Sequence, residues 1–265
     1  MNKHHALRPT ILRFESLDST NTEAARQARR GAPEGLCIVA REQTAGRGRH
    51  ERAWISPAGA GLYCSTVLRP QMELSAWPLL TLMAALAVHD ALLEACGLCT
   101  DIKWPNDILA RERKLSGILA ETVETRDAGR ACILGIGINL SDCAFPAELL
   151  EAATSIEGLT GSAPDAESLL QALLRAMARR YETLEGAGGR ALTLQAWTAR
   201  SSYAVGRPVR VSLDADAFEG TTRGLEPDGA LRVETKGGEI RIIRAGDVTA
   251  IRGMENEGGR MKDEG

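Results

Sequence analysis

Glycine and arginine alternate in the first segment of this sequence that could do chemistry, and a further arginine and a tryptophan follow closely. The residues concerned are Gly46, Arg47, Gly48, Arg49, Arg52 and Trp54. Glycine lets backbone N–H groups approach an anion, and the guanidinium fork matches the oxygens of a phosphate or a carboxylate. The pattern predicts an anion site, and a solvated basic loop is the alternative.

A second segment, 103–107, combines a lysine, a tryptophan, a proline, an asparagine and an aspartate directly after a predicted strand. Pro105 restricts the backbone, and Trp104 can anchor the segment in the core. Lys103, Asn106 and Asp107 would then face a cleft in a fixed orientation. An ordinary Asn–Asp turn is the alternative interpretation.

Two predicted strands carry small residues where a ligand could come close. Lys114 lies three residues before Gly117, and a lysine beside a glycine suits a negative charge that forms during a reaction. A surface lysine is the alternative here. Gly135 and Gly137 precede Asn139 in a segment that lacks the third glycine and the helix of a dinucleotide-binding fingerprint. Glycines two residues apart leave one face of a strand bare, which predicts that something packs there.

Apolar periodicity and turn residues predict that an α+β domain over residues 1–203 positions these segments. Thr20 and Glu23 form the capping box of its first helix, which Gly31 ends, and Ser75 is the candidate cap of a long, nearly all-apolar central helix. The segments 43–61 and 140–160 are predicted to be irregular. The expected strands and helices are strands 11–18, 36–41, 62–68, 100–103, 115–123 and 131–139, and helices 20–30, 75–96, 166–184 and 190–201.

From Gly206 the pattern changes to short β-rich runs separated by turns with glycine and aspartate. Five such runs in a short stretch predict a small β-barrel, so we expect a second domain over 204–253 and a disordered tail over 254–265. The predicted strands are 209–213, 217–225, 231–235, 240–243 and 248–251.

The composition gives no indication of a nucleic-acid or membrane partner, because the net charge is −3 and the charged residues are interspersed. The N-terminus lacks an apolar signal segment, and the longest apolar stretch, 78–93, is too short for a membrane span. Six cysteines at irregular spacing are expected to be reduced, and the single CxxC lacks the second ligand pair of a zinc site. We therefore expect a cytoplasmic protein without a resident metal.

Taken together, these motifs resemble the biotin–protein ligases over residues 14–252. The resemblance rests on Ser19-Thr20-Asn21, Gln43, the GRGR loop with its tryptophan, KWPND, KLSGIL and GIGIN, in this order. It implies a catalytic domain like that of the class II aminoacyl-tRNA synthetases, with a mixed sheet flanked by helices, and a small SH3-like C-terminal β-barrel.

The resemblance also implies the reaction and its partners. ATP and Mg²⁺ are the implied cofactors, and biotin is the implied substrate. Biotin carboxylate attacks the α-phosphate of Mg·ATP to give biotinyl-5′-AMP and pyrophosphate. A lysine of the biotin carboxyl carrier protein of acetyl-CoA carboxylase or a related carboxylase then attacks the mixed anhydride and releases AMP.

Site residues follow from the positions that match the family. Lys114, Arg49 and Asp107 are the catalytic candidates, with Asp107 orienting or deprotonating the incoming amine. Segment 140–155 corresponds to an adenylate-covering loop. The biotin- and nucleotide-binding candidates are Ser19, Thr20, Asn21, Gln43, Gly46, Arg47, Gly48, Arg49, Trp54, Lys103, Asn106, Lys114, Gly117, Gly137 and Asn139.

The chain departs from the family pattern at one position of the loop. The family often has glycine where this chain has Glu51, after His50, and neither residue is assigned a role.

About ten residues precede the first predicted strand, so we expect no N-terminal DNA-binding domain and no repressor function. A lipoate–protein ligase would carry an Arg-Arg-x-Ser-Gly-Gly-Gly loop, which is absent, and a catalytically inactive nucleotide-binding module is disfavoured by the competent residues at every matched position. The sequence leaves the oligomeric state open, with a homodimer as one alternative.

Overall fold

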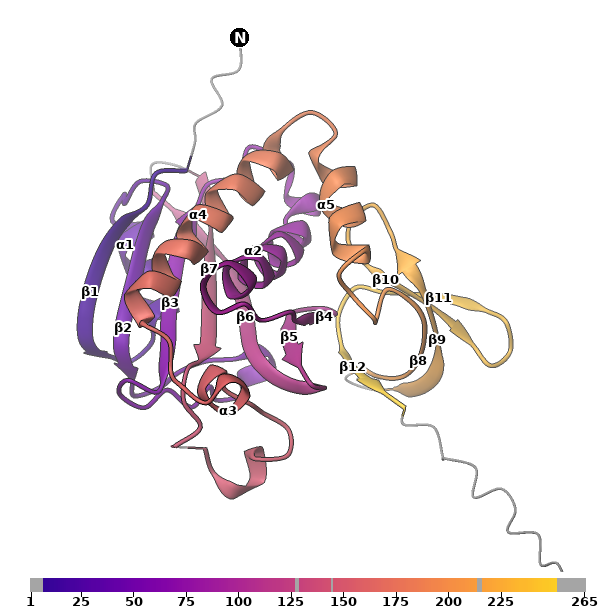
Figure 1. Cartoon of the computed structure of the whole chain (residues 1–265). Coiled ribbons are helices and arrows are strands. Elements are labelled where there is room, and N and C mark those ends of the chain that lie inside the picture. Colours follow the sequence, from indigo (N-terminus) through magenta and orange to yellow (C-terminus); the bar gives the residue numbers. More distant parts are fainter. Residues whose placement is uncertain (1–6, 127–128, 144, 214–215, 252–265) are drawn as a thin grey trace, which may run out of the picture.

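A seven-stranded mixed sheet forms the centre of the larger part of the chain (Figure 1). The computed structural model describes residues 7–126, 129–143, 145–213 and 216–251. The strands β1 and β2 pair in parallel, and the other neighbours pair antiparallel. In spatial order they are β1 (Thr10–Leu17), β2 (Leu36–Gln43), β3 (Gly61–Leu68), β7 (Gly129–Asn139), β6 (Arg113–Thr125), β5 (Asp107–Ala110) and β4 (Asp101–Lys103). The predicted mixed sheet flanked by helices is confirmed.

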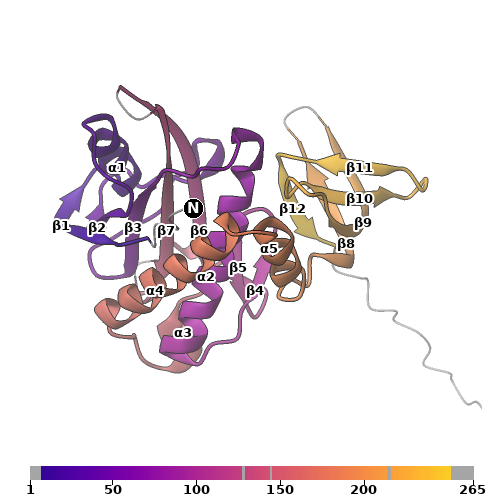
Figure 2. The same cartoon turned by 90° about the horizontal axis from the view of Figure 1, so that it is seen from above.

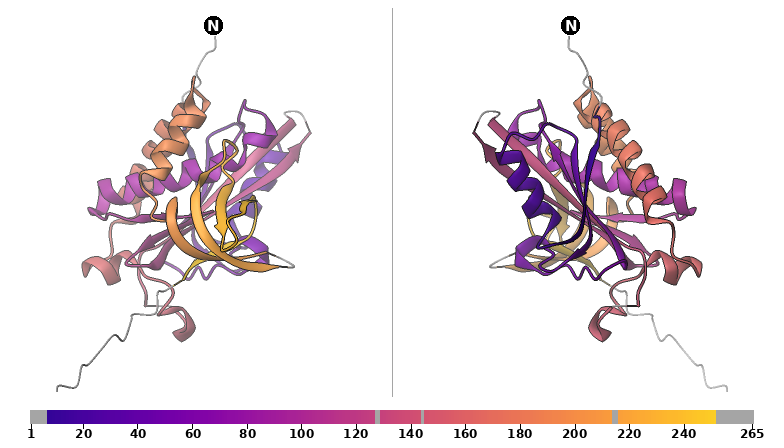
Figure 3. Two further views of the ribbon diagram at one scale, coloured as in Figure 1. Left: turned by 90° about the vertical axis from the view of Figure 1, so that its right-hand side faces the viewer. Right: turned by 90° about the vertical axis from the view of Figure 1, so that its left-hand side faces the viewer.

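Helices cover the two faces of this sheet unequally (Figure 3). The short helix α1 (Thr20–Arg29) packs on one face through Ala24 and Ala28. The opposite face carries the larger apolar cluster, which includes α2 (Pro78–Cys96) and α4 (Ala166–Glu185), while α5 (Gly189–Thr198) contacts both of these helices. The thinly covered face beside the start of α1 is where the candidate site lies.

The helix α2 is the predicted central buried helix, and eleven of its 19 residues are buried. Together with the preceding turn it spans Leu74–Cys96, which is long and apolar enough to cross a membrane by length and composition. The predicted apolar stretch 78–93 is shorter than this helix, so length alone does not exclude a membrane span. Its burial between the sheet and α4 explains the apolar composition without a membrane.

Both predicted helix caps are corrected by the structure. Ser19, not Thr20, is the N-cap of α1 and makes no side-chain cap bond, while the Thr20 hydroxyl donates to Gln43 Oε1. The helix α2 begins at Pro78 after a 3₁₀ turn (η2, Leu74–Ala76), so Ser75 does not cap it. At Thr20 a tertiary contact overrides the local capping signal, and at Ser75 the 3₁₀ turn places the helix start three residues later.

The sequence prediction missed β5, which forms a hairpin with β4 across residues 104–106. Only four residues long, β5 is followed by a turn at Arg111 and Glu112, whose φ angles are 51° and 62°. Such a turn normally carries asparagine or glycine, so the usual hairpin signal is absent here. The segment 140–160 is not wholly irregular either: it contains η3 (Ala147–Leu149) and α3 (Ile156–Thr160), which Ser155 caps by accepting from Gly158 N.

The second sheet is antiparallel and five-stranded, with strands close to the predicted ranges. Its spatial order is β11 (Ile240–Ile243), β10 (Leu231–Thr235), β9 (Ala217–Leu225), β8 (Val205–Ser212) and β12 (Asp247–Ala250). It lies beside α5 and β4 at one end of the molecule (Figure 2). Trp104 Nε1 donates to Gly229 O at 3.0 Å, and apolar residues of the two sheets share one cluster. The predicted tail over 254–265 lies outside the described residues.

Candidate active site

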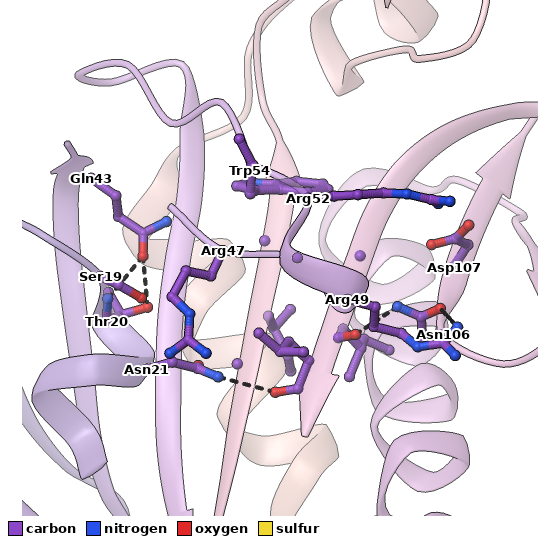
Figure 4. Close-up of a pocket in the computed structure, with 18 of the residues that line it drawn as sticks. Ser19, Thr20, Asn21, Gln43, Arg47, Arg49, Arg52, Trp54, Asn106 and Asp107 are labelled. Carbon is purple, nitrogen blue, oxygen red and sulfur yellow. Dashed lines mark hydrogen bonds between the residues drawn. The ribbon is translucent and has the colours of Figure 1, made fainter. Parts of the chain in front are cut away.

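A cavity of about 150 Å³ lies on the α1 side of the large sheet, under the loop that joins β2 to β3 (Figure 4). Its wall comes from the start of α1, the end of β2, this loop, and the strands β5, β6 and β7, and the start of β12 also reaches it. It brings together thirteen of the predicted site residues, which are Ser19, Thr20, Asn21, Gln43, Arg47, Gly48, Arg49, Trp54, Asn106, Asp107, Lys114, Gly117 and Gly137.

Three predicted site residues lie outside this lining. A Cβ on Gly46 would come within 2.2 Å of Trp54 O, so this glycine lets the loop pair with itself. Lys103 lines a neighbouring cavity of about 960 Å³. Asn139 is buried and donates to Lys114 O at 3.4 Å and to Thr154 O at 3.0 Å, and thus holds the backbone beside Lys114.

Glycines form the floor of the cavity, and their bare face is covered by two side chains. A Cβ on Gly135 would lie 2.0 Å from Asn21 Oδ1. A Cβ on Gly117 or Gly137 would lie 2.9 Å or 2.6 Å from the ring of Trp54. The indole therefore rests directly on β6 and β7, which only glycine at these positions allows.

One end of the cavity, which we call the polar end, is an uncharged hydrogen-bonding network. Gln43 Oε1 accepts from Thr20 N at 2.8 Å and from Thr20 Oγ1 at 3.1 Å, and Gln43 Nε2 donates to Ser56 Oγ at 2.8 Å. Ser65 Oγ lies 2.7 Å from Thr20 Oγ1 and 2.6 Å from Asn21 Oδ1. Thr20, Asn21, Ser56 and Ser65 are buried and Gln43 is half-buried. Because these groups bond to one another, their orientation is fixed before any ligand arrives.

The other end, which we call the charged end, contains two lysines around one carboxylate. Lys114 Nζ lies 2.6 Å from Asp107 Oδ1, and Lys103 Nζ lies 3.5 Å from Asp107 Oδ2. Lys114 Nζ is also 5.4 Å from the centre of the Trp54 ring. Asn106 donates to Ile118 O at 2.7 Å, so the β4–β5 turn is fastened to β6. A charge-rich cluster of this kind can stabilise a developing anion.

Arg49 connects the loop to the second sheet. Its guanidinium donates to Asn106 Oδ1 and to Gly246 O at 3.3 Å, and it lies 3.8 Å from Asp247 Oδ1. Arg52 also pairs with Asp247. Burial lowers the pKa of Arg49, while Asp247 and Asp107 act in the opposite direction. The guanidinium remains charged because its ordinary pKa lies far above neutrality.

The loop itself carries local strain. Its two arms pair through Trp54 N to Gly46 O at 2.9 Å and Gly48 N to Arg52 O at 2.7 Å. At its tip, His50 and Glu51 adopt left-handed conformations with φ of 52° and 58°. A glycine at position 51 would adopt this conformation without a steric penalty.

Sequence reasoning missed several residues that belong to this arrangement. Asp247 lines the cavity from the second sheet, where no chemical group was expected. Ser65 lies under the polar end, and Glu121 contacts both Arg47 and Asn21. The sequence gives these residues no motif, because each acts through a partner far away along the chain.

Comparison with known proteins points to one family. Residues 13–139 match the Biotin/lipoate A/B protein ligase family, and residues 204–249 match the Biotin protein ligase C terminal domain. A bifunctional ligase/repressor BirA of Bacillus subtilis is 39% identical over 239 residues, which cover 89% of this chain and 72% of that protein. A biotin--[acetyl-CoA-carboxylase] ligase of Paracoccus denitrificans is 38% identical, covering 87% of this chain and 96% of that protein.

Solved structures agree as well. The biotin protein ligase from Aquifex aeolicus in complex with biotin and ATP superimposes with a TM-score of 0.79 at 28% identity, over 92% of this chain and 99% of that one. The biotin protein ligase from Leishmania major in complex with biotinyl-5-AMP gives a TM-score of 0.62 at 26% identity, over 90% and 100%. With two segment matches and relatives of this length and identity, the chain belongs to the biotin protein ligase family.

Proposed function

We propose that this protein activates biotin with ATP and joins it to a lysine of a carrier protein. The observation that carries the proposal is the meeting of the polar end and the charged end in one cavity. The polar end suits a small ring with N–H donors and a carbonyl, and the charged end suits a carboxylate beside a phosphate. Family membership supplies the reaction that joins the two.

The polar end is proposed to bind the ureido ring of biotin. Asn21 Oδ1 has a lone pair beyond the contact with Ser65, and Gln43 Nε2 has a hydrogen beyond its bond to Ser56. These two groups offer an acceptor and a donor, which match the N–H and carbonyl of a ureido group. Ser19 and Thr20, at the start of α1, complete the wall.

The charged end is proposed to stabilise the first step. An oxygen of the biotin carboxylate attacks the α-phosphorus of ATP, the bond to the bridging oxygen breaks, and pyrophosphate leaves with its electrons. Lys114, which lines the cavity, is proposed to stabilise the negative charge that builds up on the phosphate oxygens. Arg47 and Arg49 are the proposed clamps, and Gly46 and Gly48 let the loop close.

The remaining candidate residues are proposed to shape the site. Trp54 covers the floor that Gly117 and Gly137 leave bare. Lys103 and Asn106 flank Asp107, and Asn139 supports the strand of Lys114. Magnesium is proposed to enter as part of the Mg·ATP substrate, because this ion is usually held by substrate phosphates and one or two carboxylates.

For the second step, the larger cavity is the proposed entrance for the carrier lysine. It shares Arg52, Asp107 and Lys114 with the first cavity and is bordered by Tyr203 and Arg207 toward the second sheet. The amine nitrogen attacks the carbonyl carbon of the adenylate, the bond to the phosphate oxygen breaks, and AMP leaves. Asp107 is the proposed group that orients the amine and accepts its proton.

The proposed partner is the biotin carboxyl carrier protein of acetyl-CoA carboxylase or a related carboxylase, following the name of the Paracoccus relative. All six cysteines are free, which suits our proposal of a reducing cytoplasmic location. We propose the ligase function alone, although the Bacillus relative is also named a repressor, because the matched segments are those of the ligase. A mobility-shift assay on operator DNA tests that choice, and light scattering tests a homodimer.

The deciding experiment is to incubate the protein with biotin, Mg·ATP and a carrier domain and to weigh the carrier. We expect a mass gain of one biotinyl group, release of pyrophosphate and AMP, and no gain without ATP. A parallel reaction with lipoate is the control, because the matched family includes both kinds of ligase. Attachment of lipoate in preference to biotin would overturn the proposal.

A further inference from the structure

Glu121 is a carboxylate on a strand beside the cavity, and it has no part in the proposed binding or transfer of biotin. It lies on β6, and its side chain is 28% exposed. Arg47 Nη2 donates to Glu121 Oε1 at 2.6 Å, and Asn21 Nδ2 donates to Glu121 Oε2 at 2.7 Å. One carboxylate therefore holds a loop arginine with one oxygen and a residue of the polar end with the other.

We propose that Glu121 is a positioning residue that couples closure of the glycine–arginine loop to the ureido end of the biotin site. The proposal rests on the proposed function, since it assigns Glu121 a part in holding the same ligand. Glu121 itself lies outside the lining of the cavity. Glu121 acts through Asn21 and Arg47, both of which line the cavity.

The contact with Asn21 fixes the direction of an amide. Asn21 Nδ2 donates to Leu119 O at 3.3 Å and to Glu121, so both of its hydrogens are used. Asn21 Oδ1 then has to face Ser65 and the floor at Gly135. Without the carboxylate, the amide could turn over and present N–H groups where the ligand's own N–H groups need an acceptor.

The contact with Arg47 fixes a side chain that is otherwise free. Its side chain is 50% exposed, and an exposed arginine samples many rotamers unless a partner holds it. An isolated ion pair at such a site contributes little. This one shares its carboxylate with the buried Asn21, whose position is already fixed. The loop arm that carries Arg47 is thereby attached to the part of the site that does not move.

Glu121→Gln tests the proposal, because it keeps the size of the side chain and removes its charge. A glutamine can accept from only one of the two donors, since its amide nitrogen faces the other. We expect the KM for biotin and the rate of biotinyl-5′-AMP escape each to rise about tenfold. The kcat for pyrophosphate release should stay within about twofold, since Lys114 is untouched.

Glu124→Gln is the matched control. Glu124 lies three residues further along β6, its side chain is 84% exposed, and its ion pair with Arg130 is 3.6 Å long. It should change neither KM nor escape. In an Arg47→Ala background the glutamine oxygen can serve Asn21 alone, so Glu121→Gln should no longer speed escape and should raise the KM for biotin less than it does when Arg47 is present.

The outcomes are distinguishable from failure of the proposed function. If the unmodified protein makes no biotinyl-5′-AMP, the proposed function is wrong. If it does, and Glu121→Gln matches Glu124→Gln in KM and escape, the coupling role is wrong. A fall in kcat together with a lower Tm, with KM unchanged, would also overturn the proposal by making Glu121 a purely structural residue. Glu121→Asp, which keeps the charge but is too short to reach both donors, should give an intermediate result.

Discussion

The two ends of the cavity are built on different physical principles. The polar end consists of neutral groups on α1, β2 and β3, of which Gln43 is half-buried and the others are almost fully buried, with Ser65 and Thr20 exposed by 0% and 4%. The charged end consists of ionised side chains on loops, β5, β6 and the second sheet, with Arg49 and Lys114 exposed by 22% and 35%. Neutral buried bonds hold one geometry rigidly, whereas partly exposed charges can adjust as a reaction changes the charge of its ligand.

This difference predicts that the two ends fail differently. Changes at the polar end should weaken binding of substrate and transition state alike, and so raise KM. Changes at the charged end should lower kcat, because its groups are proposed to act on charge that appears only in the transition state.

The largest effect is expected from Lys114→Ala. Loss of one preorganised charge at the developing anion typically costs about a hundred- to a thousandfold in rate. Affinity for biotin alone should barely change, because the polar end is intact. Lys114→Arg should restore only part of the rate, since a planar fork does not replace a point charge. Single-turnover pyrophosphate release measures this, and a near-normal rate in Lys114→Ala would remove Lys114 from the chemistry.

Ser65→Ala should have the next largest effect and the opposite kinetic signature. It removes the one hydroxyl that lies within hydrogen-bond distance of both Thr20 Oγ1 and Asn21 Oδ1 in a buried site. The cost is about 1–3 kcal/mol, or roughly a tenfold to hundredfold rise in the KM for biotin. Ser162→Ala, at an exposed position, is the control. Should kcat fall instead of KM rising, the two ends would not be separable as described.

Asp247→Asn should have a smaller effect. It tests whether the second sheet, which carries Asp247, contributes to the charged end. The carboxylate is about one third exposed and pairs with Arg52 and, at 3.8 Å, with Arg49. Partly exposed pairs contribute about 1 kcal/mol or less, so adenylate escape should rise by about threefold to fivefold. Biotinylation of a bystander protein measures escape. Asp216→Asn, which breaks the ion pair with Arg241 in the same sheet, should leave it unchanged.

The difference between local patterns and long-range contacts explains what the sequence could predict. Strand and helix positions follow from local periodicity and turns, so most elements and the order of the motifs were predicted correctly. The missing strand β5 was too short and lacked a hairpin signal. Ser65, Glu121 and Asp247 gave no signal, because their partners lie 44 to 198 residues away and only the folded chain brings them together.

The same limit applied to the helix start at Thr20. A local capping box was predicted there, but the hydroxyl is used by Gln43, 23 residues further along the chain. The Thr20 hydroxyl, which the local sequence pattern predicts as a helix cap, is therefore part of the hydrogen-bonding network at the polar end. Where a sequence rule fails at a buried polar residue, a site is a reasonable explanation.

The smallest effect is expected from Glu51→Gly, which tests whether strain in the loop tip limits closure. Glu51 has a φ of 58°, and a non-glycine residue in this region costs about 1–2 kcal/mol. Glycine removes that cost but also gives the open loop more freedom, which offsets about 0.5–1 kcal/mol. The net gain of about 0.5 kcal/mol should slow adenylate escape by roughly twofold.

Arg111→Gly is the matched control, since Arg111 has a φ of 51° in the β5–β6 turn. It should raise Tm slightly without changing escape. Faster escape in Glu51→Gly would mean that the Glu51 side chain, or the stiffness it gives the loop, helps to hold the loop closed, and the loop strain would then be a consequence of that role.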